Sequence, residues 1–324
     1  MKYPLLYLLL ALLITASCSS REEKILKLER QMAESPTVDR SRKLVALYED
    51  ELENPEGSEK RFVTAPVQPL IQAYVRHANA FPSDMQYTPE YLYKAAQLQL
   101  DSKMYIPARN NFMRIVSTYP ESDYAPRSLY RVAQMTKDRF GDMEGATLFY
   151  QTLIEGYPES EYTDSARTVA DGNETLEALM LDYGDRLYLD TARTMINREM
   201  ARRLTDAMEM YVVAHPDAPN ADRQLYAAFE MSQSFNDPQR SLQLLNKLLR
   251  RYPESQETAT ALFMKAFLYE ERLDNLDSAR VTYETYLARF PDHALTESAR
   301  FNLKNIGRSK EEVLDELIRN RTEQ

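Results

Sequence analysis

The sequence predicts an all-α fold in which antiparallel helical hairpins stack into a solenoid of about six repeat units plus capping helices. Glycine is rare, at 7 of 324 residues, and runs of β-branched residues are few, which favours helices over strands. A phrase in which proline follows an aromatic residue or histidine recurs at intervals of 38, 38, 58, 37 and 38 residues. Such an interval is typical of repeat architectures. The phrases are Phe81-Pro82, Tyr119-Pro120, Tyr157-Pro158, His215-Pro216, Tyr252-Pro253 and Phe290-Pro291.

The residues before each proline predict a helix that ends at the proline. Positions 12, 8 and 5 before it are mostly apolar or small, and steps of four and three residues define one face of a helix. The residue before a proline is pushed out of the α region, so the helix stops there. In chain order the three sets are Leu70, Ala108, Ala146, Leu204, Ser241 and Ala279; Tyr74, Phe112, Tyr150, Met208, Leu245 and Tyr283; and His77, Ile115, Leu153, Tyr211, Leu248 and Tyr286.

The residues after each proline predict the first helix of the next hairpin. Ser122, Ser160 and Ser255 stand two residues after their prolines, where an N-cap would satisfy the first N–H groups of the helix. Small residues recur eight positions after the proline, and they allow two helices to approach closely. Aromatic residues recur ten positions after it, and we assign them to the core. These two sets are Ser128, Ala166, Ala261 and Ala299, and Tyr130, Tyr226, Phe263 and Phe301.

The interval from Pro158 to Pro216 is 20 residues longer than one repeat. Residues 170–173 and 182–185 each contain glycine and aspartate, and either segment could break a helix. Asp190–Ala214 then reads as one long helix. The interval 159–215 is either a hinge between two repeat blocks or a single distorted repeat.

The first residues predict a secretory signal peptide at 1–17, with a positive start, a short apolar core and small residues before the cleavage point. Cys18 is the only cysteine, and its position resembles a bacterial lipobox. That resemblance implies cleavage before Cys18 and lipidation of its thiol. An ordinary signal peptide with an incidental cysteine is the alternative.

The remaining chain divides into four predicted segments. Residues 18–60 form a lipidated tether with capping helices at Arg21–Glu34 and Asp39–Glu53, and 61–185 and 186–307 form two repeat blocks. Residues 308–324 form a terminal capping helix that begins with a capping box, in which Ser309 and Glu312 satisfy each other's N–H groups. A partner-binding helix is the alternative for this last segment.

The pattern from about Val67 to Ile306 resembles the tetratricopeptide repeat (TPR). The small residue early in the first helix, the Ala-x-x-x-aromatic of the second helix and the closing proline all match. The resemblance implies a right-handed superhelix. The period of 37–38 residues exceeds the usual ~34, and no tryptophan opens the first helix.

Repeats of this length that close on Tyr-Pro-Glu-Ser are similar to those of bacterial envelope proteins. Two such families are the lipoprotein of the outer-membrane β-barrel assembly machine (the BamD type) and the periplasmic Tol–Pal coordinator. With Cys18, the first resemblance implies a lipid-anchored scaffold at the cell outer membrane, on its periplasmic face or exposed at the cell surface. Its expected partners are other envelope proteins or unfolded peptide segments. The Tol–Pal type carries an amino-terminal coiled coil, and Arg21–Glu34 is too short for one.

A solenoid presents a concave groove that commonly binds an extended peptide or a helix. We expect polar residues on the first helix of each hairpin to face this groove. The candidates are Tyr91, Lys94, Arg127, Arg131 and Lys137.

The sequence offers little for catalysis. Its three histidines, His77, His215 and His293, lie far apart, and no paired Cys/His spacing indicates a metal. No Gly-rich phosphate loop or nucleophile elbow appears, and a net charge of −10 disfavours nucleic acid. We therefore expect no catalytic residue, cofactor or small-molecule substrate. A cell-wall-degrading enzyme with a repeat domain is the remaining alternative, although no segment is left to house its catalytic fold.

Overall fold

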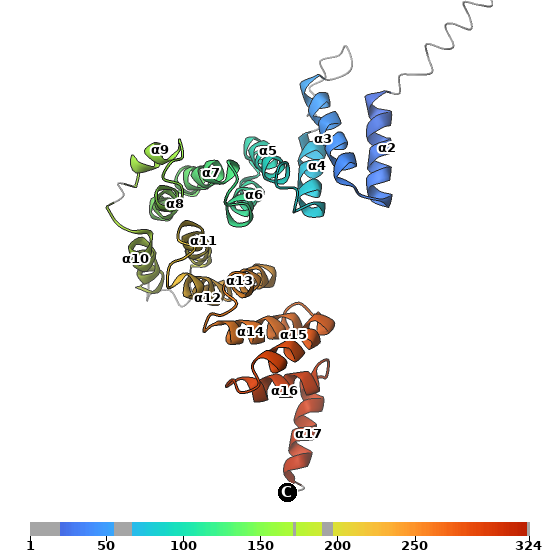
Figure 1. Cartoon of the computed structure of the whole chain (residues 1–324), viewed down its shortest axis with the longest axis vertical. Coiled ribbons are helices and arrows are strands. Elements are labelled where there is room, and N and C mark those ends of the chain that lie inside the picture. Colours follow the sequence, from blue (N-terminus) through green and yellow to red (C-terminus); the bar gives the residue numbers. More distant parts are fainter. Residues whose placement is uncertain (1–19, 55–66, 171–172, 190–196, 323–324) are drawn as a thin grey trace, which may run out of the picture. The chain divides into compact units, whose positions relative to one another are not determined.

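The computed structural model describes residues 20–54, 67–170, 173–189 and 197–322, and in this part of the chain helices are joined by turns and loops, without a strand (Figure 1). The predicted signal peptide and Cys18 lie outside the described residues. The chain divides into two compact units, Met1–Met135 and Thr136–Gln324. The division falls within one helix, and the predicted block boundary at 185/186 lies inside another.

In the first unit, each helix packs against the next along the chain from α2 to α6. The first two helices begin within one residue of their predicted starts. The helices are α2 (Arg21–Glu34), α3 (Val38–Glu53), α4 (Val67–Ala80), α5 (Thr88–Asp101), α6 (Tyr105–Thr118) and the start of α7 (Tyr124–Asp138).

In the second unit, consecutive helices pack in the same way from α10 to α16, and α8 contacts α9, α10 and α11. This order of packing is that of a helical repeat solenoid. The helices are α8 (Met143–Gly156), α9 (Thr163–Arg167), α10 (Leu176–Leu189), α11 (Arg198–Ala214), α12 (Ala221–Ser232), α13 (Pro238–Arg251), α14 (Thr258–Glu271), α15 (Leu276–Arg289), α16 (Thr296–Asn305) and α17 (Lys310–Thr322).

All six proline phrases end a helix, as predicted. In each, the N–H of the residue before proline still donates to the carbonyl four residues earlier, at 2.7–3.0 Å. Proline cannot donate the next bond of the ladder, so the helix stops. The helices that end in this way are α4, α6, α8, α11, α13 and α15.

The serines two residues after proline are not helix N-caps, and that prediction was wrong. The Oγ atoms of Ser122, Ser160 and Ser255 accept the N–H two residues further on, at 3.2, 3.3 and 3.0 Å. In each case this N–H belongs to the tight turn that precedes the helix or to its first residue. The chain makes one extra turn after the proline before it becomes helical, so serine stabilises that turn instead.

A threonine at the start of the first helix closes the same turn, and sequence reasoning missed it. The hydroxyls of Thr163, Thr258 and Thr296 donate to the carbonyl of the aromatic residue before proline, at 2.7, 3.0 and 2.9 Å. Thr88 makes the equivalent bond to Phe81, but across seven residues instead of six. The turn after Pro82 is therefore one residue longer than the other three. Counted from the proline, each position in α5 lies one residue later than its equivalent in α9, α14 and α16.

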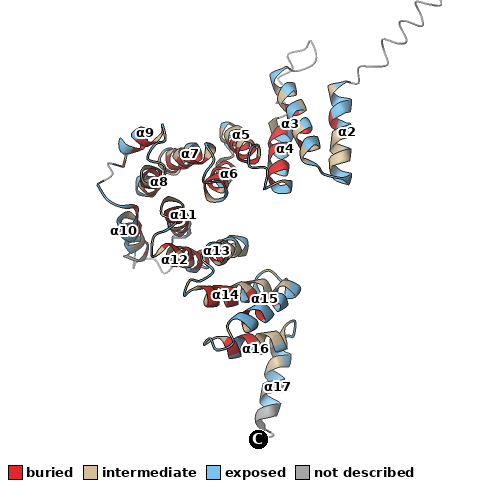
Figure 2. Ribbon diagram, viewed as in Figure 1, coloured by how far each residue is buried: buried red, intermediate tan, exposed pale blue. Residues whose placement is uncertain are grey.

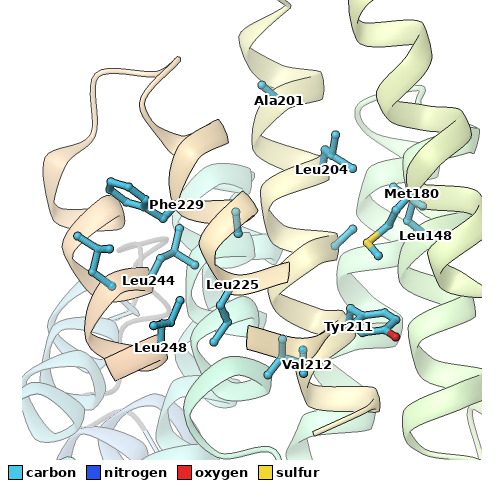
Figure 3. Packing of buried hydrophobic residues seen from close by; sticks show 14 of the residues in the cluster. Leu148, Met180, Ala201, Leu204, Tyr211, Val212, Leu225, Phe229, Leu244 and Leu248 are labelled. Atoms are coloured by element: carbon cyan, nitrogen blue, oxygen red, sulfur yellow. The ribbon is translucent and has the colours of Figure 1, made fainter. Parts of the chain in front are cut away.

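The predicted helix faces form the core. Every residue at positions 12 and 5 before a proline is buried, and position 8 is buried in all units except at Met208. In Figure 2, buried residues lie on helix faces that pack against neighbouring helices. Figure 3 shows a buried cluster of the second unit, where residues from α8, α10, α11, α12 and α13 meet; among those labelled are Leu148, Met180, Leu204, Leu225, Phe229, Leu244 and Leu248.

The recurring aromatic residues are not all core residues, and that prediction was wrong in part. Phe263 is 8% exposed and packs against Tyr283 of α15, with ring centroids 5.9 Å apart. Tyr130 and Tyr226 are only half-buried, and Phe301 is 45% exposed. Phe263 is buried because Tyr283 and Tyr286 of α15, the second helix of its own hairpin, cover it.

The described residues of the interval 159–215 contain the helices α9, α10 and α11, and α11 covers the described part of the long helix predicted at 190–214. Gly184 lies inside the continuous helix α10, where an added Cβ would be 3.4 Å from Leu204 Cδ2. Helix α11 begins at Arg198 because the Asn197 side chain accepts the N–H groups of Glu199 and Met200. The predicted start of this helix at Asp190 lies outside the described residues.

Within the described residues, no helix is both long and apolar enough to cross a bilayer.

Candidate functional site

The five predicted groove residues occupy different environments. Tyr91 is 5% exposed, and its ring lies against Tyr74 and His77 at centroid distances of 5.1 and 4.8 Å. It belongs to the core, because the shift in α5 turns it inward. Arg127 is exposed, while Arg131 and Lys137 are half-buried. Lys137 belongs to the second unit.

Lys94 joins α3 to α5 through a small ionic network. Its ammonium lies 2.8 Å from Glu49 and 2.7 Å from Glu90, and Glu49 also accepts the Tyr74 hydroxyl at 2.6 Å. Burial would lower the pKa of Lys94, but the two carboxylates raise it above its ordinary value. The Lys94 ammonium is thus already paired within the protein, so it is less available than an unpaired ammonium to bind a carboxylate of another protein.

Arg127 presents a cation on α7 that an aromatic ring orients. Its guanidinium carbon lies 4.7 Å from the centroid of the Tyr93 ring on α5. Tyr93 is itself held by Phe112 and Tyr124, each with its centroid 5.4 Å away. A stacked guanidinium keeps its donors free in one plane, and this geometry suits a carboxylate. Arg131 lies one helical turn further along α7.

A pocket of about 420 Å³ opens at the end of α4 in the first unit. The Arg42 guanidinium forms one wall and stacks 3.9 Å from the Tyr87 ring centroid. It donates to both carboxylate oxygens of Asp84, at 2.8 and 2.7 Å. The pocket is lined by Val38, Arg42, Ala80, Phe81, Pro82, Ser83 and Asp84.

Behind this pocket, Ser41, His77 and Asp84 form a hydrogen-bonded chain. His77 Nδ1 lies 3.0 Å from Ser41 Oγ, and Nε2 lies 3.1 Å from Asp84 Oδ2. Ionised Asp84 only accepts, so Nε2 carries the ring proton and Nδ1 accepts from the Ser41 hydroxyl. Burial lowers the pKa of His77, and Asp84 only partly opposes this.

These three residue types also form hydrolase triads, but the arrangement here is structural. Ser41 is 3% exposed and His77 is fully buried, so a substrate cannot reach the hydroxyl. The chain of bonds joins α3, α4 and the turn after Pro82. Sequence reasoning placed His77 only on an apolar helix face; its one signal was a histidine where other repeats have apolar or aromatic residues.

The second unit contains a buried cluster of four charges between α11 and α13. Arg240 lies 2.9 Å from Asp206 and 2.5 Å from Glu209, and Lys247 lies 2.5 Å from Glu209. Burial would raise the pKa of Glu209, but the two cations outweigh it and lower the pKa to about 2. The cluster joins α11 and α13, the second helices of two successive hairpins. No sequence motif predicted it.

A third polar site fixes α10 and α11 against the start of α8. Asp142 caps α8 by accepting the Gly145 N–H at 2.9 Å. Its other oxygen accepts the Tyr183 hydroxyl and pairs with Arg203, both at 2.8 Å. An added Cβ on Gly145 would clash with that second oxygen, so a larger residue here would displace the carboxylate from Tyr183 and Arg203.

Metal-binding geometry is not found among the described residues: they hold no group of three or more His, Cys, Asp or Glu side chains suited to an ion.

Comparison with known proteins agrees with the repeat architecture. Residues 260–293 match the tetratricopeptide repeat family. The match covers most of α14, all of α15 and the closing Pro291. No curated protein sequence matches the chain significantly. The matched segment and the helix-by-helix packing support a tetratricopeptide repeat protein.

Proposed function

We propose that this protein is a membrane-anchored scaffold of the bacterial envelope that binds other proteins through its tetratricopeptide repeats. The match at 260–293 supports the protein-binding part of this proposal, and the same proline-closed hairpin recurs along the chain. Repeats of this kind stack into extended surfaces that bind peptides and helices.

The membrane anchor in this proposal is a lipid on Cys18. Only Ser19 and Ser20 separate Cys18 from the start of α2 at Arg21, so the first helix would stand close to the bilayer. One acyl chain holds a protein only marginally, whereas several anchor it stably. The protein would then reside at the outer membrane, facing the periplasm or the cell surface.

The partner is another envelope protein or an unfolded segment of one. By the family resemblance, the first candidate is the barrel-forming subunit of the outer-membrane assembly machine or the carboxyl-terminal segment of its substrates. Arg127 is the favoured contact, because its stacked guanidinium is exposed and matches a carboxylate. Tol–Pal components are the second candidate.

The test is an affinity pull-down of the intact protein from gently solubilised native membranes, read by mass spectrometry. Recovery of a barrel-assembly subunit supports the first candidate, and recovery of Tol–Pal components or cell-wall enzymes supports the second. Arg127→Glu should reduce recovery. Arg280→Glu, an exposed arginine on the second helix α15, is the matched control and should not. Recovery of no envelope protein would contradict the proposal.

A separate experiment tests the anchor. Cells fed labelled palmitate should incorporate the label into the protein, and Cys18→Ala should abolish the label and release the protein from membranes. Membrane retention of the unlabelled variant would contradict lipid anchoring.

A further inference from the structure

The pocket at the end of α4 opens at a turn that lacks a hydrogen bond found at two later turns. The Tyr119 hydroxyl donates to the carbonyl of Pro82, and the Tyr252 hydroxyl donates to that of Pro216. In both places a backbone carbonyl of the preceding turn binds the ring residue that stands before proline. Phe81 stands before its proline in the same way. It has no hydroxyl to donate, and it lines the pocket.

The pocket is large enough for an amino-acid side chain and is largely apolar. Its volume of about 420 Å³ lies in the range of roughly 300–1,000 Å³ that is typical of small-ligand sites. Val38 of α3, Ala80 of α4 and the residues Phe81 and Pro82 form its apolar walls. All of its lining residues belong to the first unit. These walls favour an aliphatic or aromatic group, because binding removes apolar surface from water.

Arg42 offers the pocket hydrogen-bond donors that the protein itself does not use. Nε and Nη2 donate to the Asp84 carboxylate at 2.7–3.1 Å. No described residue accepts a hydrogen bond from Nη1. The Tyr87 ring centroid lies 3.9 Å from the guanidinium carbon and covers one face of the group. The guanidinium is thus held at one edge and on one face, and its remaining N–H groups suit an acceptor on a ligand.

The charges at the pocket favour a neutral acceptor over a carboxylate. Burial would raise the pKa of Asp84, but the Arg42 guanidinium lowers it below its ordinary value. Asp84 is therefore ionised at neutral pH, and the pair carries no net charge. His77 behind the pair is neutral, because burial lowers its pKa. A carboxylate on a ligand would be repelled by Asp84, whereas a peptide carbonyl would not.

We propose that this pocket binds an uncharged peptide segment, with an apolar side chain against its apolar walls and a neighbouring backbone carbonyl accepting from Arg42. Ser83 also lines the pocket, and its hydroxyl can accept the N–H of the same peptide segment. The site lies at helix ends of the first unit and does not include Arg127. The inference rests on the proposed protein-binding function only in that the ligand is a peptide segment.

Methyl NMR of the full chain, in its lipid-free Cys18→Ser form, tests the proposal with N-acetyl-leucinamide as the probe. The methyl signals of Val38 and Ala80 should shift with a dissociation constant on the order of 1 mM, as expected of so small a ligand. The methyl signals of Val281, an exposed residue of α15, should not move.

Two related probes test the chemistry of the ligand. N-acetyl-glycinamide keeps both amides but lacks the apolar side chain, so it should bind about tenfold more weakly or worse. N-acetylleucine keeps the side chain and replaces the terminal amide by a carboxylate, so it should also bind more weakly than the amide. Equal or tighter binding of either probe would overturn the proposal.

Three variants test the contacts. Ala80→Phe fills the pocket from an exposed position at the end of α4 and should abolish the shift of the Val38 methyls. Ala288→Phe, at an exposed alanine near the end of α15, is the matched control and should leave the shift unchanged. Arg42→Lys keeps a positive charge beside Asp84 but has fewer donors, so it should weaken binding by about threefold to tenfold.

Circular dichroism of each variant separates lost binding from lost helix. The three probes act on the chain without a pocket substitution, so the proposal stays testable if a variant fails to fold. Absence of a shift at Val38 at tens of millimolar of the amide, or unchanged binding by a folded Ala80→Phe chain, would overturn it. The pull-down reads whole protein partners and the NMR titration reads this pocket alone, so failure of one is distinguishable from failure of the other.

Discussion

The two units secure their helices with buried polar groups of different kinds. In the first unit, a neutral imidazole, His77, joins Ser41 to the Arg42–Asp84 ion pair. In the second, four charges meet without a neutral member, and Glu209 at their centre has a 4% exposed side chain. Both units are built from the same proline-closed hairpins, which we call the repeat frame. The comparison therefore isolates what a buried neutral group and a buried ionic cluster each contribute to stability. We therefore expect the two units to lose stability at different pH values.

The largest expected effect comes from breaking the ionic cluster. Glu209→Gln leaves Arg240 and Lys247 buried without their shared carboxylate. Removing one partner of a buried ion pair costs about 3–5 kcal/mol. Urea unfolding followed by far-UV circular dichroism should show this loss in the transition of the second unit.

The matched control for Glu209 is a carboxylate in an exposed ion pair. Glu144 pairs with Arg186, and both side chains are about half exposed. Glu144→Gln should change the free energy of unfolding by less than about 1 kcal/mol. Equal losses in the two variants would mean that burial does not distinguish them.

The next effect comes from the first unit. His77→Ala removes a fully buried ring and leaves Ser41 and Asp84 without their shared partner. Cavity formation and two broken hydrogen bonds should together cost about 2–4 kcal/mol. The transition of the first unit should move to lower urea while that of the second stays. A shift of both transitions would show that the two units unfold together.

The pH dependence of stability sharpens the comparison. Burial lowers the pKa of His77, so the folded state resists protonation while the unfolded chain takes up a proton near pH 6.5. The unfolded state then binds more protons, and the first unit loses stability as pH falls below about 6.5, by up to ~1.4 kcal/mol per pH unit. The pKa of Glu209 is lowered to about 2, so its contribution persists at neutral pH and is lost only as pH falls from about 4.5 toward 2.

Urea unfolding at pH 7.5, 6.5 and 5.5 checks this order. The midpoint of the first unit should fall across the series, and that of the second should hold. His77→Gln keeps hydrogen-bonding capacity without a titrating ring, so it should flatten the profile of the first unit. A profile that remains steep in this variant would assign the titration to another group.

Much of the fold followed from the sequence because its signals are local. Proline removes a donor and restricts the residue before it, so every helix end at a proline phrase was predictable. Helix faces at steps of four and three gave the core at Leu70, Ala108 and Ala146. The segment around Gly184 was predicted as a possible helix break, but α10 continues past it. Glycine also occurs where two helices approach closely, and Gly184 lies near Leu204 of α11.

The polar sites were not predictable, because their members come from distant positions. Ser41 and His77 are 36 residues apart, and Glu209 and Lys247 are 38 apart, so no motif joins them. Tyr91 is buried because the turn after Pro82 contains one extra residue. The spacing between prolines does not reveal this residue, because Pro82 and Pro120 are still 38 residues apart. Whether Arg127 or Arg131 contacts a partner remains a prediction for the pull-down.

The smallest expected effect tests what the units share. Tyr119 donates its hydroxyl to the Pro82 carbonyl at 2.8 Å in the first unit, and Tyr252 donates to the Pro216 carbonyl at 2.7 Å in the second. Each bond ties one closing turn to the turn of the preceding hairpin. Tyr119→Phe and Tyr252→Phe should each cost about 1 kcal/mol, the net value of one hydrogen bond, each in its own transition by urea unfolding. Because both bonds belong to the repeat frame and neither partner titrates near neutral pH, the two losses should be alike and independent of pH from 7.5 to 5.5. If only one variant loses stability, the repeat frame does not contribute equally in the two units. The losses at His77 and Glu209 would then have to be compared with the loss from the tyrosine variant of the same unit.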